Sequence, residues 1–375
     1  MGLLKEIGEF GLIEKIASSF SVPDGYLGIG DDCAVLPQEN GRQTLVSTDM
    51  LVEGTHFLLS DISPFDLGWK SAAVNFSDIA ASGGRPVGSF LSIALPPTLS
   101  EEWVDSFLAG YRRMSDLAGA AAGVAGADGN GAAAGVAAGA AAGAAATPLQ
   151  VGSAAGVPLL GGDTTSSPDR LCINVTVIGE AECGLSRLRS AARPGDLVCV
   201  TGTLGDSAAG LRQILEGRPR SNYLIQRHYR PQPRIAEGLI LASCEGVHAM
   251  MDISDGVASD LRHILKASGV GARIDVTALS LSPALLETCA ASGWDPVRLA
   301  LCGGEDYELL FTLAPSALAS LSSLLPTGGI VPAGGTADQL PTGGATGFTV
   351  IGEITATPGL VWQNSAEDYF GYTHF

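Results

Sequence analysis

Aspartates beside glycine or small hydroxyl residues recur where apolar strands are predicted to end. A further carboxylate, that of Asp78, lies in a predicted helix. Magnesium prefers oxygen ligands and is often shared between one or two carboxylates and substrate phosphates. Neighbouring glycines let backbone N–H groups approach phosphate oxygens. The aspartate turns therefore predict a magnesium and phosphate site, and they are Gly28-Ile29-Gly30-Asp31-Asp32, Ser47-Thr48-Asp49, Gly161-Gly162-Asp163-Thr164-Thr165 and Asp252-Ile253-Ser254-Asp255-Gly256.

A single turn of this kind is weak evidence, because Gly-Asp and Asp-Gly dipeptides most often only reverse the chain. Four of them in one sequence favour a metal site. The four turns contain no histidine or cysteine, which favours magnesium over zinc. Calcium stays an alternative in principle, although the sequence has no EF-hand loop with a glutamate at its twelfth position.

Familiar phosphate-handling motifs are missing from the sequence. Its four lysines, at positions 5, 15, 70 and 266, are not part of a G-x-x-x-x-G-K-[ST] loop. It also has no H-R-D, D-F-G or G-x-S-x-G motif. Phosphate chemistry would therefore have to depend on metal ions and arginines.

Composition narrows the class of protein. The 375 residues are 46% hydrophobic and have a formal charge of −18, which disfavours nucleic acid or an anionic membrane as a partner. Seven scattered cysteines without a C-x-x-C pair are typical of a reducing compartment. Charged residues interrupt the first twenty positions, so a signal peptide is not expected. We expect a cytoplasmic protein.

Hydrophobic periodicity predicts alternating helices and strands in two domains. Helices are expected near the N-terminus and over residues 65–82 and 100–117, the last with Ser100 as its N-cap. A β-branched run from Leu197 to Thr201 predicts a strand that follows a turn. We place an N-terminal ATP- and magnesium-binding domain at residues 1–180 and a C-terminal domain, which completes the nucleotide and substrate site, at 181–375.

An Ala/Gly-rich segment at residues 118–150 interrupts the first domain. Glycines recur every four residues between 131 and 143. Such a repeat can be a transmembrane packing face, but Ala and Gly are weakly apolar and Asp128 and Asn130 interrupt the run. We predict a low-complexity surface insertion, and a second mobile loop in the glycine-rich residues 327–347.

With these motifs in place, the sequence resembles the thiamine-monophosphate kinase family, of the superfamily that includes aminoimidazole ribonucleotide and selenophosphate synthetases. The motifs that carry the resemblance lie at residues 28–34, 47–57, 73–81, 161–165, 252–261 and 303–309. The last of them reads Gly303-Gly304-Glu305-Asp306-Tyr307-Glu308-Leu309. The match runs nearly end to end and leaves out only the two glycine-rich segments.

The resemblance implies an α/β fold of α+β type. It implies an N-terminal sheet domain that forms a barrel with its twin in a homodimer, and a larger C-terminal α/β domain. It also implies ATP and thiamine monophosphate as substrates, several Mg²⁺ ions as cofactor, and no nucleic acid or membrane partner. The implied metal ligands are Asp32, Ser47, Thr48, Asp49, Asp78, Asp163, Asp252 and Asp255. The implied ATP contacts are Gly162, Asp163, Arg189 and Ser254, and the implied substrate contacts are His56, Glu305 and Tyr369.

The sequence departs from the family pattern at two places. Tyr369 lies shortly before the terminal Gly-Tyr-x-His-Phe, at the place where the family usually has Trp. We expect its ring to stack on the cationic thiazolium, although packing of the C-terminal tail is the commoner role for a lone terminal aromatic. The insertion also lies just upstream of Gly161, where the family has an aromatic nucleotide contact that stays unassigned.

Structural roles without any ligand contact remain alternatives for several of these residues. His56 can be a structural histidine beside Phe57, and Glu305 with Asp306 can be a solvated turn. Arg187, Arg189 and Arg193 can be a basic surface patch, although guanidinium groups suit phosphate binding.

The expected chemistry needs no general base, because a phosphate oxygen of the acceptor is already anionic at pH 7. Positioning and electrostatics would supply the catalysis. The rival activities are a sister enzyme that activates an amide or selenide with ATP, and a non-enzymatic cation-binding module. The first rival is disfavoured by the absence of a cysteine before Cys33.

Overall fold

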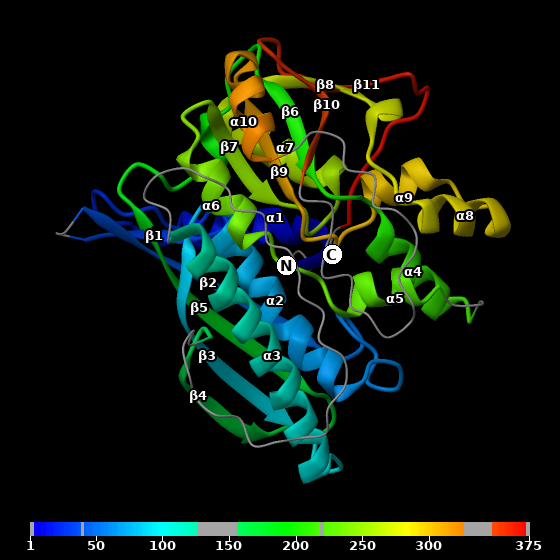
Figure 1. The fold of residues 1–375 in the computed structure, drawn as a ribbon. Helices are drawn as coiled ribbons and strands as arrows, with labels where there is room; N and C mark the ends of the chain where they lie inside the picture. The colour runs from blue at the N-terminus through cyan, green and yellow to red at the C-terminus, as the bar shows by residue number, and fades with distance from the viewer. Residues whose placement is uncertain (1–3, 39–40, 127–155, 218–220, 326–346, 373–375) are drawn as a thin grey trace.

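The computed structural model describes residues 4–38, 41–126, 156–217, 221–325 and 347–372 as two α/β units, each built on one sheet (Figure 1). The first sheet has the strand order β1-β2-β5-β3-β4. Its neighbours are antiparallel except for β3 and β4, which are parallel. The strands are β1 (Ala34–Pro37), β2 (Arg42–Val52), β3 (Arg85–Leu95), β4 (Leu159–Ser166) and β5 (Cys172–Glu182).

Helices α2 (Pro64–Ala81) and α3 (Glu101–Gly126) lie side by side across this sheet (Figure 1). Their close approach requires glycine on both helices. A Cβ atom on Gly68 would lie 1.9 Å from the carbonyl oxygen of Phe107, and one on Gly110 would lie 1.9 Å from that of Phe65. The pair buries a core in which Trp69, Phe76 and Phe107 are at most 1% exposed.

The second sheet has the strand order β11-β8-β10-β6-β9-β7. Its strands are β6 (Leu197–Thr201), β7 (Val247–Asp252), β8 (Gly271–Asp275), β9 (Leu309–Leu313), β10 (Phe348–Thr355) and β11 (Gly359–Gln363). The helices of this half are α4 (Asp206–Leu215), α5 (Asn222–Tyr229), α6 (Ile235–Ser243), α7 (Val257–Ser268), α8 (Pro283–Ser292), α9 (Pro296–Cys302) and α10 (Leu318–Leu324). Three short 3₁₀ turns, η1 (Arg189–Ala191), η2 (Val276–Ala278) and η3 (Pro315–Ala317), complete it.

Helix α2 joins the two halves of the molecule. The indole N–H of Trp69 donates to the carbonyl oxygen of Pro231 at 2.8 Å, and the Ser77 hydroxyl donates to Asp252 Oδ2 at 2.6 Å. Arg230 also pairs with Asp66 in the first turn of the helix. Three points along α2 are thus fixed to the second half, so the helix can hold groups from both halves in register.

Most of the predicted elements are confirmed, with two corrections. The expected helix over 65–82 is α2, the strand over 197–201 is β6, the N-terminal helix is α1 (Leu4–Ala17), and Ser100 accepts from Trp103 N as the predicted N-cap. The prediction that the insertion begins at residue 118 is wrong. Helix α3 continues to Gly126, because Ala118 and Ala122 are small enough to pack into the core at 1% and 7% exposure. Residues 127–150 and 327–346 lie outside the described residues.

The aspartates do not all lie at strand ends, contrary to the prediction. Asp252 ends β7, but Asp49 lies within β2 and Asp163 within β4, because apolar or β-branched residues continue each strand. The strands described in one chain form an open sheet, so the predicted dimer barrel stays a prediction. None of the described helices combines the length and apolar character that crossing a membrane requires.

Candidate functional site

Three aspartates from different elements meet where the two halves join. Asp32 comes from the turn before β1, Asp78 from the last turn of α2, and Asp252 from the end of β7. One carboxylate oxygen of each lies within 4.8 Å of the others, a separation that a single cation could bridge. We call Asp32, Asp78 and Asp252 the acidic cluster.

The inner face of β2 contributes to the same place. Leu45, Ser47, Asp49 and Leu51 alternate toward α2, as the two-residue period of a strand dictates. Ser47 donates a short hydrogen bond to Asp78 Oδ2, and the backbone N–H of Asp49 donates to Asn75 Oδ1 at 3.0 Å. Two predicted ligands are therefore placed beside the acidic cluster by strand alternation.

The pKa values show that these carboxylates carry more negative charge than their surroundings neutralise. Burial, followed by the charge of Asp32, raises the pKa of Asp49 to about 6 and that of Asp252 to about 8. Burial and the charges of Asp49, Asp252 and Asp32 also raise the pKa of Asp78 well above its usual value. Separating acidic groups from water without a matching cation favours their protonated forms.

The donor set fits a hard divalent cation. Carboxylate and hydroxyl oxygens are the ligands that Mg²⁺ prefers. Asp32 Oδ2 is buried without a hydrogen-bond partner among the described residues, so an acceptor is left over for an ion. A bound cation would both satisfy this atom and relieve the repulsion within the acidic cluster.

Arg189 contributes a guanidinium group at the edge of the acidic cluster. Its Nη2 lies 2.5 Å from Asp32 Oδ1, and its backbone N–H donates to Asp31 Oδ2 at 3.1 Å. Arg187 instead donates to the carbonyl oxygens of Ala242 and Cys244. The described contacts therefore favour a site role for Arg189 and a structural role for Arg187.

The turn after β7 lies against the Glu305 segment. The carbonyl oxygen of Ser254 accepts from the N–H of Glu305 at 2.7 Å, and a Cβ atom on Gly304 would lie 2.1 Å from that oxygen. The N–H of Asp255 donates to Asp260 Oδ2 at 3.2 Å. Ser254 and Asp255 are thus fixed close to Asp252, at the end of the acidic cluster nearest α7.

Three predicted residues of the first sheet lie away from the acidic cluster. Thr48 points to the opposite face of β2, where its hydroxyl lies 2.9 Å from that of Thr176. Gly162 is in register with Asp49 across β5 and β3, so β4 lies three strand spacings, or roughly 14 Å, from β2. Asp163 is exposed on β4 and accepts from its neighbour's N–H. A role for Gly162 and Asp163 at the nucleotide stays a prediction.

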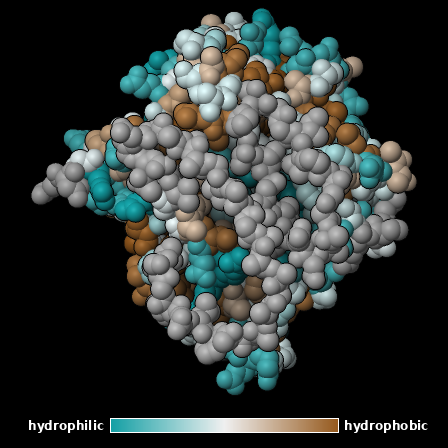
Figure 2. All heavy atoms as spheres, viewed as in Figure 1, coloured by the Kyte–Doolittle hydropathy of each residue, from teal (hydrophilic) through white to brown (hydrophobic). Residues whose placement is uncertain are grey.

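A pocket of about 440 Å³ adjoins Gly162. Side chains of α3, β3 and β4 line it, including Leu91, Phe107 and Leu160. The walls of this pocket are mostly apolar, whereas the acidic cluster consists of carboxylates. Figure 2 shows further apolar atoms at the edge of this half of the molecule, where the strands of the first sheet are drawn in Figure 1.

The Glu305 carboxylate is surrounded by basic groups. Oε1 lies 2.8 Å from Lys70 Nζ on α2, and Oε2 lies 3.2 Å from His228 Nδ1 on α5. Burial alone would raise the pKa of Glu305, but the charge of Lys70 holds it below its usual value. Burial and Lys70 lower the pKa of His228 to about 3, so this histidine is neutral at pH 7.

His56 is oriented by its own loop. Its Nδ1 accepts from the N–H of Val52 at 3.0 Å, which leaves the proton of the neutral ring on Nε2. His56 is half-buried, and its imidazole is among the groups whose nearness lowers the pKa of Glu305. The two predicted substrate residues, His56 and Glu305, therefore lie near each other.

Tyr369 is 4% exposed and packs in the core of the second half. Its ring meets that of Trp362 edge to face at 5.2 Å, and its hydroxyl lies 3.0 Å from Ser365 Oγ. Arg262 holds the same segment by donating to the carbonyl oxygen of Tyr369 at 2.8 Å. These contacts support the packing alternative, and stacking of Tyr369 on a substrate stays a prediction.

Sequence reasoning missed Lys70, Ser77 and Tyr307. Burial, then the charges of Glu305, Asp49 and Asp252, raises the pKa of Tyr307, so this residue lies near both Glu305 and the acidic cluster. Tyr307 has φ of 51° and Glu305 has φ of 63°, a conformation that side chains other than glycine rarely adopt. A usable signal existed for Lys70, since it is a lone charge inside the apolar part of α2.

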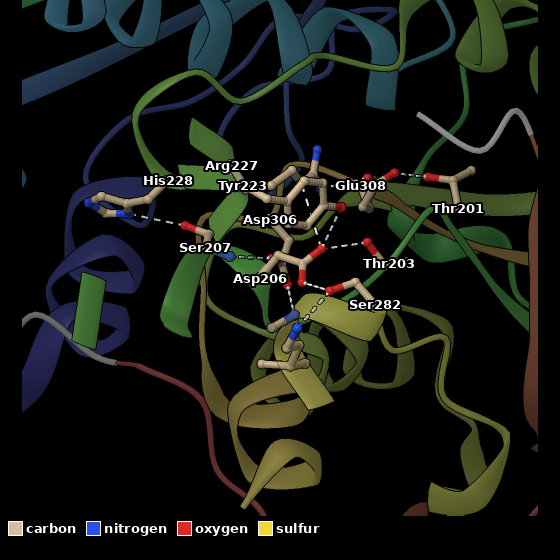
Figure 3. A network of polar contacts seen from close by, with 12 residues as sticks. Thr201, Thr203, Asp206, Ser207, Tyr223, Arg227, His228, Ser282, Asp306 and Glu308 are labelled. Carbon is tan, nitrogen blue, oxygen red and sulfur yellow. Dashed lines mark hydrogen bonds and ion pairs between the residues drawn. The ribbon is translucent and has the colours of Figure 1, made fainter. Parts of the chain in front are cut away.

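A second polar network, in the C-terminal half, includes Asp306 and Glu308 (Figure 3). Glu308, which is fully buried, accepts from Arg227 at 2.8 Å, Arg234 at 2.6 Å and Thr201 at 2.7 Å. Asp306 accepts from Gly205 N at 2.7 Å and so caps α4, whose own N-cap is a glycine. We call Glu308, Arg227, Arg234 and Thr201 the Glu308 network.

Comparisons with known proteins identify the family to which the chain belongs. Residues 30–128 and 124–181 match the N-terminal domain of AIR synthase related proteins, and residues 193–321 match their C-terminal domain. The chain is 37% identical to the thiamine-monophosphate kinase of Escherichia coli strain K12 over 98% of both chains. It is also 37% identical to that of Bacillus subtilis over 77% of this chain and 78% of the relative.

Solved structures extend the comparison to the fold. The structure of AaThiL complexed with AMPPCP and TMP is 31% identical, has a TM-score of 0.75, and is matched over 100% of this chain and 99% of that one. The thiamine monophosphate kinase of Aquifex aeolicus is 30% identical with a TM-score of 0.71, over 98% of this chain and 100% of that one. The hydrogenase maturation protein HypE of E. coli, at 19% identity and a TM-score of 0.59 over 88% of this chain and 85% of that one, shares the fold.

Proposed function

The chain belongs to the thiamine-monophosphate kinase family, and from that premise we propose how its own residues perform the family's reaction. The enzyme phosphorylates thiamine monophosphate to thiamine diphosphate with ATP. The acidic cluster at the junction of the two halves is the observation that carries the residue assignments.

We assign Mg²⁺ to Asp32, Asp78 and Asp252, with Ser47, Asp49 and Asp255 beside them. The unpartnered Asp32 Oδ2 and the raised pKa values of Asp49 and Asp252 support this assignment. When bound, Mg²⁺ would neutralise phosphate charge and stabilise the charge that develops on the transferring phosphoryl group. Of the remaining predicted ligands, Thr48 could take part only through its backbone, since its hydroxyl lies on the opposite face of β2.

The ATP phosphates are expected between the acidic cluster and the turn at Ser254. Arg189 is the guanidinium group that contacts this cluster, and it would orient an anion beside Asp32. Gly162 and Asp163 would contact the nucleotide farther from β2, next to the apolar pocket of β4 and α3. Positioning of two anionic phosphates is then the main task, because the acceptor oxygen needs no base.

The acceptor is expected to bind with its organic cation toward Glu305. The carboxylate is 25% exposed and ionised, so it can face the thiazolium or the aminopyrimidine, with His56 beside it. Its phosphate would then point along α2 toward the acidic cluster. Tyr369 would have to leave its contact with Trp362 in order to stack on this ligand.

A homodimer through the first sheet also belongs to this proposal. Met50 and Leu160 are 58% and 57% exposed on strands of that sheet, and the whole of β4 is exposed at its edge. Pairing this surface with its copy would cover the apolar side chains and the free strand edge. A cytoplasmic location is proposed with it, in keeping with seven free cysteines.

A coupled assay of ADP formation tests the proposed function. We expect turnover of thiamine monophosphate with ATP and Mg²⁺ and little turnover of free thiamine, which lacks the anionic nucleophile. Absence of turnover with the monophosphate, or equal turnover of free thiamine, would contradict it. If ADP forms from ATP only when an amide or selenide is the acceptor, and with neither thiamine monophosphate nor free thiamine, a sister enzyme would be favoured.

A further inference from the structure

Lys70 is a lysine without exposed surface inside the core of the first half. It lies on α2 between Trp69 and Ser71, which are 1% and 0% exposed, and it is itself 0% exposed. Moving an ammonium group out of water costs several kcal/mol unless the group is paired, and an apolar side chain would fill such a position at no such cost. A buried lysine at this point therefore needs a reason beyond packing.

The one carboxylate that pairs with Lys70 among the described residues belongs to the other half of the molecule. Nζ lies 2.8 Å from Glu305 Oε1, and the side chain of Glu305 is 25% exposed whereas that of Lys70 is 1% exposed. The ammonium makes no hydrogen bond of good geometry within the described chain, so the ion pair with Glu305 is the described contact that compensates its charge. The pair thus has a buried cationic end and a carboxylate end that ligands can reach.

The position of Lys70 along α2 relates this pair to the acidic cluster. Ser77, seven residues later, donates to Asp252 at 2.6 Å. Seven residues are two helical turns, so both side chains point from the same face and lie on the order of 10 Å apart along the axis. One rigid helix therefore holds the Glu305 carboxylate at one point and the acidic cluster at another.

We propose that Lys70 is a positioning residue that fixes the Glu305 carboxylate toward the cationic part of the acceptor, and that α2 thereby sets the distance between acceptor recognition and phosphoryl transfer. The inference rests on the proposed function, which places the organic cation at Glu305. Lys70 acts through Glu305 and need not touch the substrate. Replacing Lys70 should therefore change the KM for the acceptor and leave the KM for ATP unchanged.

The backbone at Glu305 supports a role in positioning. Glu305 has φ of 63°, and its N–H donates to the carbonyl oxygen of Ser254 at 2.7 Å, next to the metal-binding turn. A strained backbone persists where surrounding contacts determine it. Lys70 and His228 hold the two oxygens of the carboxylate, so the side chain as well as the backbone has a defined orientation.

The test compares steady-state constants for thiamine monophosphate and for ATP in four proteins: wild type, Lys70→Met, Glu305→Gln and the double variant. Methionine keeps the length of the lysine side chain and removes its charge. We expect Lys70→Met to raise the KM for thiamine monophosphate roughly ten- to a hundredfold. The KM for ATP should stay within about twofold, because the acidic cluster is untouched.

The double variant separates positioning from folding. Lys70→Met leaves the partly buried Glu305 carboxylate without its cation and could unfold the protein, whereas Lys70→Met with Glu305→Gln has no unpaired charge at this place. If Lys70 acts through Glu305, the double variant should have the KM of Glu305→Gln alone to within about threefold. Independent effects would instead multiply.

Trp69→Phe is the matched control. It removes the neighbouring contact between α2 and Pro231 without touching Glu305. It should lower the melting temperature and leave both KM values within about twofold of wild type.

Three outcomes decide the inference. A selective rise in the KM for the acceptor that vanishes in the Glu305→Gln background supports it. Equal changes in both KM values, or effects of Lys70→Met and Glu305→Gln that multiply, would overturn it. A wild-type protein that does not turn over thiamine monophosphate would overturn the proposed function, and this inference with it. A wild-type protein that does turn it over, with variants that lack the selective change in KM, would overturn this inference alone.

Discussion

The acidic cluster and the Glu308 network are both buried and both contain carboxylates, but they differ in charge balance. Glu308 has two guanidinium groups and a hydroxyl, and although burial alone would raise its pKa, Arg234 and Arg227 hold it below its usual value. Asp32, Asp78 and Asp252 have raised pKa values, with Arg189 as the guanidinium group in contact. A balanced network stabilises the fold, whereas an unbalanced one is a place for a cation.

The two sites also differ in where their members come from. The Glu308 network lies within the second half, where Thr201 ends β6, Arg227 lies in α5, Arg234 is the N-cap of α6 and Glu308 directly precedes β9. Figure 3 shows Glu308 with Thr201 and Arg227. The acidic cluster takes its members from both halves of the molecule. Groups that line a junction can remain open to ligands and still be surrounded by protein, which is why burial and reactivity coexist there.

The largest expected effect comes from neutralising one member of the acidic cluster. Asp78→Asn should lower kcat/KM by roughly a hundred- to ten-thousandfold, because a metal ligand at the transferring phosphate is lost. Its melting temperature without metal should stay equal or rise, since repulsion within the acidic cluster is relieved. Steady-state kinetics and calorimetry check both. A large loss of stability would show that the acidic cluster stabilises the fold as the Glu308 network does.

Removing the charge of Glu308 should lower the stability of the fold and leave the KM values nearly unchanged, the opposite of the effect expected for Asp78→Asn. Glu308→Gln leaves Arg227 and Arg234 buried without a counter-charge, so we expect a loss of about 3–5 kcal/mol in the free energy of unfolding. The KM values of the protein that stays folded should change little. Thr201→Val, which removes one hydrogen bond to the same carboxylate, is the matched control and should cost about 1–3 kcal/mol. Urea unfolding measures both.

The stabilising effect of Mg²⁺ should depend on pH. Asp49 and Asp252 have pKa values of about 6 and 8, above those of an unfolded chain. Their contribution to stability is complete at low pH and is lost in the metal-free protein as pH rises through 6 and 8. Mg²⁺ binds the ionised forms, so the rise in melting temperature on adding Mg²⁺ should grow between pH 6 and pH 8.5. A constant shift over this range would contradict the charge imbalance.

The smallest expected effect is at Tyr369, whose hydroxyl is paired like the groups of the Glu308 network. Tyr369→Phe removes the contact with Ser365 and should cost about 0.5–1.5 kcal/mol in the free energy of unfolding, with the KM for thiamine monophosphate unchanged. Thermal unfolding and acceptor titrations check this. A selective change in that KM would show that Tyr369 leaves Trp362 and meets the substrate.

The sequence by itself determined the elements and the kind of chemistry. Periodicity placed α2 and β6, Ser100 identified the start of α3, and the aspartate turns indicated oxygen ligands for a hard cation. These are local properties, since the amphipathic period and the cap each depend on residues a few positions apart. Alanine at 118 and 122 was misread for the same reason, because only the packed core shows that small side chains are needed there.

Tertiary structure alone decided which of these residues meet. Strand alternation turned Asp49 toward α2 and Thr48 away from it. Strand order put Asp163 on the edge strand β4, three strands away from β2. The partner of Lys70 is 235 positions away in sequence (305 minus 70), in the other half of the molecule. Contacts of this range depend on how the two sheets and α2 pack together, and a one-dimensional pattern contains no information about that packing.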